Sequence, residues 1–252
     1  MTLITPKIPQ DYGLELSKGN IPNHIGINKY GSNTGIDTVT DPETIWSAGG
    51  LYAFLSSAGT VAVVSSDAND DDGDTGARTI FIEGLDTNYD QITETVTLNG
   101  TGSVHTTTHT DWLRLNRAYV ASAGSSEKNE EIITMTVGGT TVATIPAEKG
   151  QTQQAIYTIP NGYRGYVTNL SGAIVKGAGA ATSADIQYYS RKNGVTRLQQ
   201  EISLDSTGTS EFNKIYPIPL GFEEKTDLYA EALVGANNTA VFVNFGIIIA
   251  KQ

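Results

Sequence analysis

The chain has 252 residues, a net charge of −11 and no cysteine, so it can bury a sizeable core but cannot use disulfides, thiol catalysis or thiolate metal sites. Its 32 threonines and 27 glycines stand beside only 17% charged residues, a composition that favours many short strands. Residues 1–150 hold 8 basic and 19 acidic side chains, and this negative excess argues against a nucleic-acid partner.

No stretch approaches the roughly 20 consecutive apolar residues that cross a bilayer, so we expect no membrane partner. The first residues, MTLITPKIPQDYG, lack the basic and then apolar order of a signal peptide. We therefore expect that the chain is synthesised and assembled in a cytoplasm.

Residues 1–45 are predicted to form an extended N-terminal arm. Four of the eight prolines fall here with glycines between them, and no alternating run is longer than a few residues. Such a segment buries too little apolar surface to offset its own ordering entropy. We therefore expect contacts with another subunit, although the arm could instead wrap its own domain. The candidate interface residues are Ile4, Ile8, Leu14, Leu16, Ile21, Ile25, Ile27, Tyr30 and Trp46.

Residues 46–122 are predicted to form a β-rich unit. In the segment QITETVTL, Ile92, Val96 and Leu98 fall on one face together with Glu94, and threonines line the other face. This period of two is typical of a half-buried strand whose solvent side is threonine. The segments VAVVSS, TIFIEGL and WLRLNRAYV are further strand candidates in the same unit.

Residues 123–252 are predicted to form a β-sandwich unit of the jelly-roll kind. Gly138 and Gly139 stand between EIITMTV and TTVATIP, and two glycines permit the positive φ angles of a tight hairpin turn. Seven or eight strand candidates then follow in about 100 residues, which matches a Greek-key sandwich. The last run, AVFVNFGIII, is apolar on both faces and indicates a central or interface strand. The fold class is therefore all-β, with antiparallel sandwich or jelly-roll-like units behind an extended arm.

Residues 67–74, with the sequence DANDDDGD, form the most acidic cluster of the chain. Gly73 stands at the seventh place and Arg78 at the twelfth, whereas a calcium loop of the EF-hand type needs glycine at the sixth and glutamate at the twelfth. We expect a solvated acidic turn here, with a looser calcium loop as the alternative. Phosphate-binding loops, nucleophile elbows and dinucleotide-binding motifs are absent from the sequence, so we expect no cofactor and no enzymatic activity.

Several short segments spread over about residues 20–230 form a recognisable series. They are NKYG at 28–31, WSAGGLY at 46–52, TGAR at 75–78, IEGLD at 82–86, ETVTLNG at 94–100, RAYV at 117–120, GQT at 150–152 and IYTIP at 156–160. Together these segments resemble a family of virion structural proteins from tailed bacteriophages, including cyanophages and other marine phages. The resemblance implies a capsid- or tail-associated β-protein without a catalytic residue.

The resemblance and the composition together predict a non-enzymatic structural protein of a phage particle. The expected role is that of a decoration or cement protein on the outer capsid surface, because the acidic part of the chain would be repelled by packaged DNA on the inner wall. The expected partners are the major capsid protein, copies of the same chain, or both, so we expect a homo-oligomer within the particle. One alternative is a tail, baseplate or fibre-attachment protein, and a second is a carbohydrate-binding or carbohydrate-degrading module of a tail spike.

Overall fold

The computed structural model describes residues 11–38, 41–175 and 182–252. Within these ranges the strands pair antiparallel and the chain forms one helix, α1 (Tyr12–Ser17), so the all-β prediction is confirmed. The strands are β1 (His24–Ile36), β2 (Glu43–Thr44), β3 (Val61–Ser65), β4 (Ala77–Asp86), β5 (Gln91–Thr97), β6 (Val104–His105), β7 (Trp112–Ala123), β8 (Ile133–Val137), β9 (Thr140–Ile145), β10 (Ile156–Thr158), β11 (Tyr163–Val175), β12 (Ser183–Lys192), β13 (Val195–Asp205), β14 (Glu211–Phe222), β15 (Asp227–Val234) and β16 (Thr239–Lys251).

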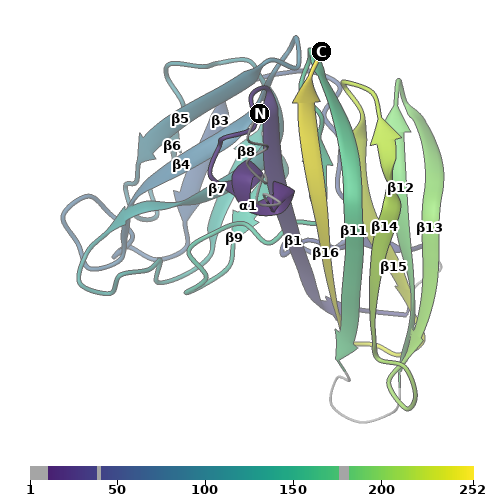
Figure 1. The fold of residues 1–252 in the computed structure, drawn as a ribbon. Coiled ribbons are helices and arrows are strands. Elements are labelled where there is room, and N and C mark those ends of the chain that lie inside the picture. Colours follow the sequence, from purple (N-terminus) through teal and green to yellow (C-terminus); the bar gives the residue numbers. More distant parts are fainter. Residues whose placement is uncertain (1–10, 39–40, 176–181) are drawn as a thin grey trace, which may run out of the picture.

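Strands β1 and β10–β16 form a jelly roll, which lies on the right in Figure 1. One sheet has the order β1-β16-β11-β14 and the facing sheet has the order β10-β15-β12-β13, with β2 added beside β15. The first strand thus pairs with the last, and from β10 onward successive strands change sheets except at the β12–β13 hairpin, which stays within one sheet, as expected for a jelly roll. The inward side chains of both sheets fill one apolar core that includes Tyr188 and Phe245. As its apolar sequence predicts, β16 is a central strand.

Strands β3–β9 form a second unit, which is inserted into the jelly roll between its first strand, β1, and its second, β10. It contains a sheet of order β6-β3-β8-β9 and a sheet of order β5-β4-β7, which share a separate apolar core around Trp112, Ile82 and Met135. The inserted unit lies beside β1 and on the opposite side of the jelly roll from β13 (Figure 1). The chain is therefore one jelly roll carrying one inserted β-unit.

The predicted arm is wrong for residues 24–36, because these residues form the first strand of the jelly roll. β1 pairs with β16 from His24 opposite Ala250 to Ile36 opposite Thr239. Gly31 looks like a strand breaker in the sequence, but here it permits close packing, since a Cβ atom would stand 2.2 Å from the backbone nitrogen of Ala155. Residues 1–10 of the predicted arm lie outside the described part of the chain.

The structure divides the chain differently from the expected ranges 46–122 and 123–252. The hairpin of β8 and β9 follows residue 123, yet β8 pairs with β3 and completes a sheet of the inserted unit. Apolar side chains from β8 and β9, Ile133 and Ile145 among them, belong to the core of that unit. Because this pairing joins segments about 70 residues apart, no local pattern in the sequence reports it.

Buried polar contacts join the inserted unit to the jelly roll. The guanidinium of Arg114 on β7 donates to the carboxylate of Asp227 on β15, at 2.8 and 3.2 Å. The same carboxylate accepts hydrogen bonds from the Thr158 hydroxyl at 2.7 Å and from Arg191 at 3.0 Å. Next to this cluster, the Asn116 side chain exchanges two hydrogen bonds with the backbone of Thr158. The junction therefore consists of buried polar groups whose hydrogen bonds to water are replaced by hydrogen bonds between the two units.

The pair of Arg114 and Asp227 is almost completely buried, with 4% of each side chain exposed. Burial alone would lower the pKa of Arg114, but the hydrogen bond and charge of Asp227 more than offset it, and the net effect is a raised pKa. Buried pairs of this kind are sensitive to the loss of one partner, because the remaining charge has no compensation.

We expect Asp227→Ala to lower the free energy of unfolding by about 3–5 kcal/mol, because it leaves the Arg114 guanidinium buried without its counter-charge. Urea unfolding followed by tryptophan fluorescence measures the change. The control is Glu148→Ala, which breaks the exposed pair of Lys128 and Glu148 and should leave the unfolding midpoint nearly unchanged. Equal decreases in the free energy of unfolding for the two substitutions would show that the buried pair stabilises the fold no more than an exposed pair does.

Candidate interaction surfaces

The edge of the jelly roll at β14 is distorted by prolines. β11 pairs through Asn169 with Ile215 and next through Val167 with Leu220, so residues 216–219 stand opposite the single residue Thr168. This segment contains Pro217 and Pro219, which have no N–H to donate to a neighbouring strand. The ladder is interrupted here, where Tyr216 packs against the jelly-roll core while Pro217, Ile218 and Pro219 are exposed.

Two isoleucines at this distorted edge are the most exposed large apolar side chains of the described residues. Ile218 is 84% exposed and Ile215 is 70% exposed. Val195 and Leu198 on β13, the edge strand of the facing sheet, are about half exposed. A hydrogen bond of 2.6 Å from the Lys214 ammonium to the Gln200 side chain holds the two edge strands together. We call the four aliphatic side chains Val195, Leu198, Ile215 and Ile218 the β13–β14 edge.

Solvent-exposed aliphatic side chains on an edge strand are a liability unless a partner covers them. None of the interface residues predicted from the sequence lies on this edge. The signal that could have found it is the run IYPIP at residues 215–219, since proline within an apolar run indicates an edge strand and alternating large apolar residues indicate a surface that needs cover.

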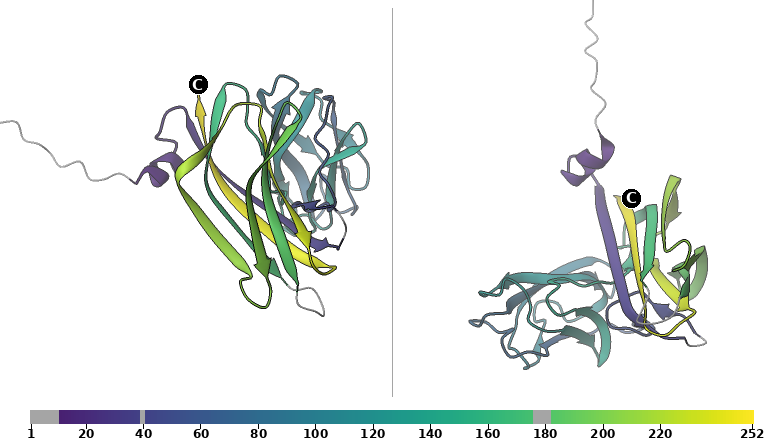
Figure 2. Two further views of the ribbon diagram at one scale, coloured as in Figure 1. Left: turned by 90° about the vertical axis from the view of Figure 1, so that its right-hand side faces the viewer. Right: turned by 90° about the horizontal axis from the view of Figure 1, so that it is seen from below.

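The helix α1 presents a smaller apolar surface near the opposite edge of the same sheet. Asp11 caps it by accepting hydrogen bonds from the backbone N–H groups of Gly13 and Leu14. Leu16 packs on Gly26 of β1, where an added Cβ atom would lie 3.1 Å from its side chain. Tyr12 and Leu14 remain about half exposed, and Figure 2 shows α1 projecting beyond the sheets.

The other predicted interface residues have separate environments. Ile25 and Tyr30 are partly exposed on β1, whereas Ile27 packs against the jelly-roll core. Trp46 is buried beside Tyr52 in a small aromatic cluster of its own chain, so its predicted contact with another subunit is wrong. Ile21 is half-buried, and Ile4 and Ile8 lie outside the described residues.

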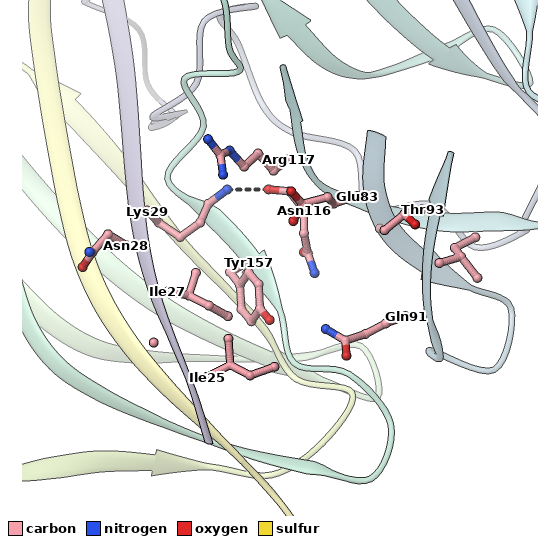
Figure 3. A pocket seen from close by; sticks show the side chains of 13 residues that line it. Ile25, Ile27, Asn28, Lys29, Glu83, Gln91, Thr93, Asn116, Arg117 and Tyr157 are labelled. Atoms are coloured by element: carbon pink, nitrogen blue, oxygen red, sulfur yellow. Dashed lines mark hydrogen bonds between the residues drawn. The ribbon is translucent and has the colours of Figure 1, made fainter. Parts of the chain in front are cut away.

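A cleft of 370 Å³ lies between β1 and the sheet of β5, β4 and β7, at the boundary of the two units. Figure 3 shows Lys29 reaching across it from β1 and donating a hydrogen bond of 2.5 Å to the backbone carbonyl of Asn116. The side chains of Glu83, Arg117 and Tyr157 line the same cleft. Lys29 therefore crosses the unit boundary with its ammonium group out of contact with bulk water.

Burial lowers the pKa of Lys29 to about 7, with a further decrease from the nearby charge of Arg117 and a partial increase from Glu83. The lysine in an unfolded chain has a pKa of about 10.4. Between these two values the unfolded chain binds one more proton than the folded chain, so the contribution of Lys29 to stability rises with pH across this window.

The acidic loop at residues 67–74 is not simply a solvated turn. The Asp70 side chain is completely buried and accepts hydrogen bonds from the Ser65 hydroxyl at 2.6 Å and from the backbone N–H groups of Ala77 and Glu130 at 2.8 and 2.9 Å. The expected solvated turn is therefore wrong for Asp70, because its carboxylate organises three segments of the inserted unit. In the described part of the chain, acidic and histidine side chains do not gather in groups of three that could hold a metal ion.

Comparisons with known proteins identify no family. Neither a family model nor a curated protein matches the chain. Among solved structures, the VP2 subviral particle of infectious bursal disease virus aligns with 94% of this chain and 76% of its own, at 10% sequence identity and a TM-score of 0.23. A structure of the Gx strain of the same virus aligns with 91% of this chain and 76% of its own, at 10% identity and a TM-score of 0.19.

The helix in the described residues is too short and too polar to span a membrane.

We expect the free energy of unfolding of the wild-type chain to increase relative to that of Lys29→Met between pH 7 and pH 10, by up to about 1.4 kcal/mol per pH unit. The methionine keeps the length of the buried side chain but removes its titration, so every other titrating group cancels in the difference. Urea unfolding at pH 6, 7.5 and 9 measures it. Parallel pH profiles for the two proteins would contradict the depressed pKa of Lys29.

Proposed function

We propose that the chain is a non-enzymatic structural component of a virus particle, held in place through the β13–β14 edge. The observation that carries the proposal is the exposure of Ile215 and Ile218 on a strand edge that prolines have withdrawn from strand pairing. A free monomer gains nothing from presenting these side chains to water, whereas a neighbouring subunit would bury them at a gain of roughly 1.5–3 kcal/mol each.

The finer part of the proposal is that the particle is a tailed bacteriophage and that the chain decorates the outside of its capsid. The resemblance of the sequence to phage virion proteins supports the particle type. The net charge of −11 supports the outer face, since packaged DNA would repel an acidic protein on the inner face. A tail or baseplate position is the rival within the same proposal, and it differs in the number of copies per particle.

The double substitution Ile215→Ser with Ile218→Ser tests the role of the edge. Because both side chains face solvent in the isolated chain, the thermal midpoint should stay within about 2 °C of the wild type, while incorporation into particles should fall at least about tenfold. Particles produced with each variant are purified and their copies of the chain are counted by quantitative mass spectrometry.

Leu51→Ser is the matched control, because Leu51 is a similarly exposed aliphatic residue remote from the β13–β14 edge in the sequence. It should be incorporated at the wild-type level. Wild-type incorporation of the double variant would exclude the β13–β14 edge as the surface that holds the chain in the particle.

A further inference from the structure

We propose that copies of the chain associate head to tail, with α1 of one copy docked on the β13–β14 edge of the next. This inference rests on the proposed structural function and names a partner for the exposed edge. Tyr12 and Leu14 of the docking copy would supply the apolar side chains that cover Ile215 and Ile218 of the receiving copy.

Within one molecule α1 does not cover the edge, because Ile215 and Ile218 remain exposed while α1 packs on β1. Leu16 fixes α1 against Gly26 of β1, and the order β1-β16-β11-β14 places two strands between β1 and β14. Three strand spacings of about 4.8 Å separate the first and fourth strands by about 14 Å. Figure 1 shows α1 at β1, on the side of the sheet next to the inserted unit. Because its own α1 leaves Ile215 and Ile218 exposed, we assign the cover of this edge to α1 of another copy.

The form of the edge favours a helix over an added strand. Strand addition needs N–H and C=O groups in register along the edge. Pro217 and Pro219 have no N–H, and the ladder is already interrupted between Ile215 and Leu220. A helix satisfies most of its backbone hydrogen bonds internally and offers mainly side chains, so it fits the interrupted segment 216–219 of β14, where Ile218 is exposed.

The residues of the two apolar patches differ in charge, although Lys18 follows α1 and Glu201 and Glu211 flank the β13–β14 edge. Residues 11–17 contain two acidic residues, Asp11 and Glu15, and no basic residue. Residues 195–200 and 214–220 contain two basic residues, Arg197 and Lys214, and no acidic residue, although the whole chain carries −11. Glu15 is paired with Lys18 of its own chain, so Asp11 provides most of the attraction. Exposed charges of this kind contribute little affinity but orient the approach of the two copies.

An interface between two different patches of one chain is heterologous. It joins each copy to two neighbours, one through α1 and one through the edge, and it forms a ring when the rotation between copies closes. A patch that paired with itself would instead stop at a dimer. The heterologous interface and the self-pairing patch therefore predict different complexes when a variant with an altered α1 is mixed with a variant with an altered edge.

The test uses two variants of the full chain and light scattering coupled to size-exclusion chromatography. The helix variant carries Tyr12→Ser and Leu14→Ser, and the edge variant carries Ile215→Ser and Ile218→Ser. We expect the wild type to form oligomers larger than dimers and each variant alone to associate at least about tenfold more weakly. An equal mixture of the two variants should form 1:1 heterodimers, because the intact α1 of the edge variant meets the intact edge of the helix variant.

Controls separate this interface from general loss of apolar surface. Leu51→Ser and Ile132→Ser remove exposed aliphatic side chains elsewhere and should leave the oligomers unchanged. All variants should keep the thermal midpoint of the wild type, since none of the substituted side chains is buried in the isolated chain.

Three outcomes would overturn the head-to-tail interface: a wild type that stays monomeric at high concentration, a helix variant that associates as well as the wild type, or a mixture that forms no heterodimer. None of these decides the proposed function, which fails only if the edge variant enters particles at the wild-type copy number. If the edge variant is excluded from particles while the helix variant is incorporated normally, the edge binds a different virion protein and the head-to-tail inference is wrong.

Discussion

The carboxylate of Asp227 holds the two units of this protein together. It receives Arg114 from the inserted unit and Thr158 and Arg191 from the jelly roll, and almost no solvent reaches it. The chain leaves the jelly roll after β2 and returns before β10, so these two connections alone would permit the inserted unit to move. The buried charge cluster, with Lys29 and Asn116 beside it, makes that movement costly because each charge would lose its partner.

The two edges of the sheet β1-β16-β11-β14 differ in how they are covered within the molecule. At the β1 edge the inserted unit stands beside the sheet, and Lys29 reaches across to it. At the β14 edge prolines interrupt the ladder and isoleucines face solvent. A strand edge that is neither paired nor covered invites uncontrolled association. Pro217 and Pro219 of β14 disfavour association through backbone pairing there while leaving side-chain docking possible, which agrees with the proposed function.

Local patterns in the sequence predicted local features well. The alternation of Ile92, Val96 and Leu98 with threonines is observed in β5 and the residue after it, with the apolar side chains directed to the core. Gly138 and Gly139 have φ angles of 57° and 84° in the turn between β8 and β9, as the predicted hairpin requires. These features depend on residues within one strand or one turn, and the sequence reports such contacts directly.

Features that depend on distant residues could not be predicted in this way. WLRLNRAYV shows a clear alternation, yet Arg114 and Asn116 are buried as well as the leucines, because β7 lies between its own unit and the jelly roll. Gly31 looked like a breaker because its close contact with Ala155 is invisible in the sequence. Asp70 looked like one of several solvated aspartates because the sequence does not show that Ser65, Ala77 and the distant Glu130 converge on its carboxylate. The candidate edge at Ile215 and Ile218 was missed although its prolines were a local signal.

The position and copy number of the chain in an intact particle test the central claim most directly. Electron cryomicroscopy of purified particles, combined with quantification of the chain relative to the major capsid protein, gives both quantities. The account predicts density for the jelly roll on the outside of the capsid, with the β13–β14 edge covered by a neighbouring subunit and with hundreds of copies per particle. Particles that lack the chain, or density in which Ile215 and Ile218 face solvent, would contradict it.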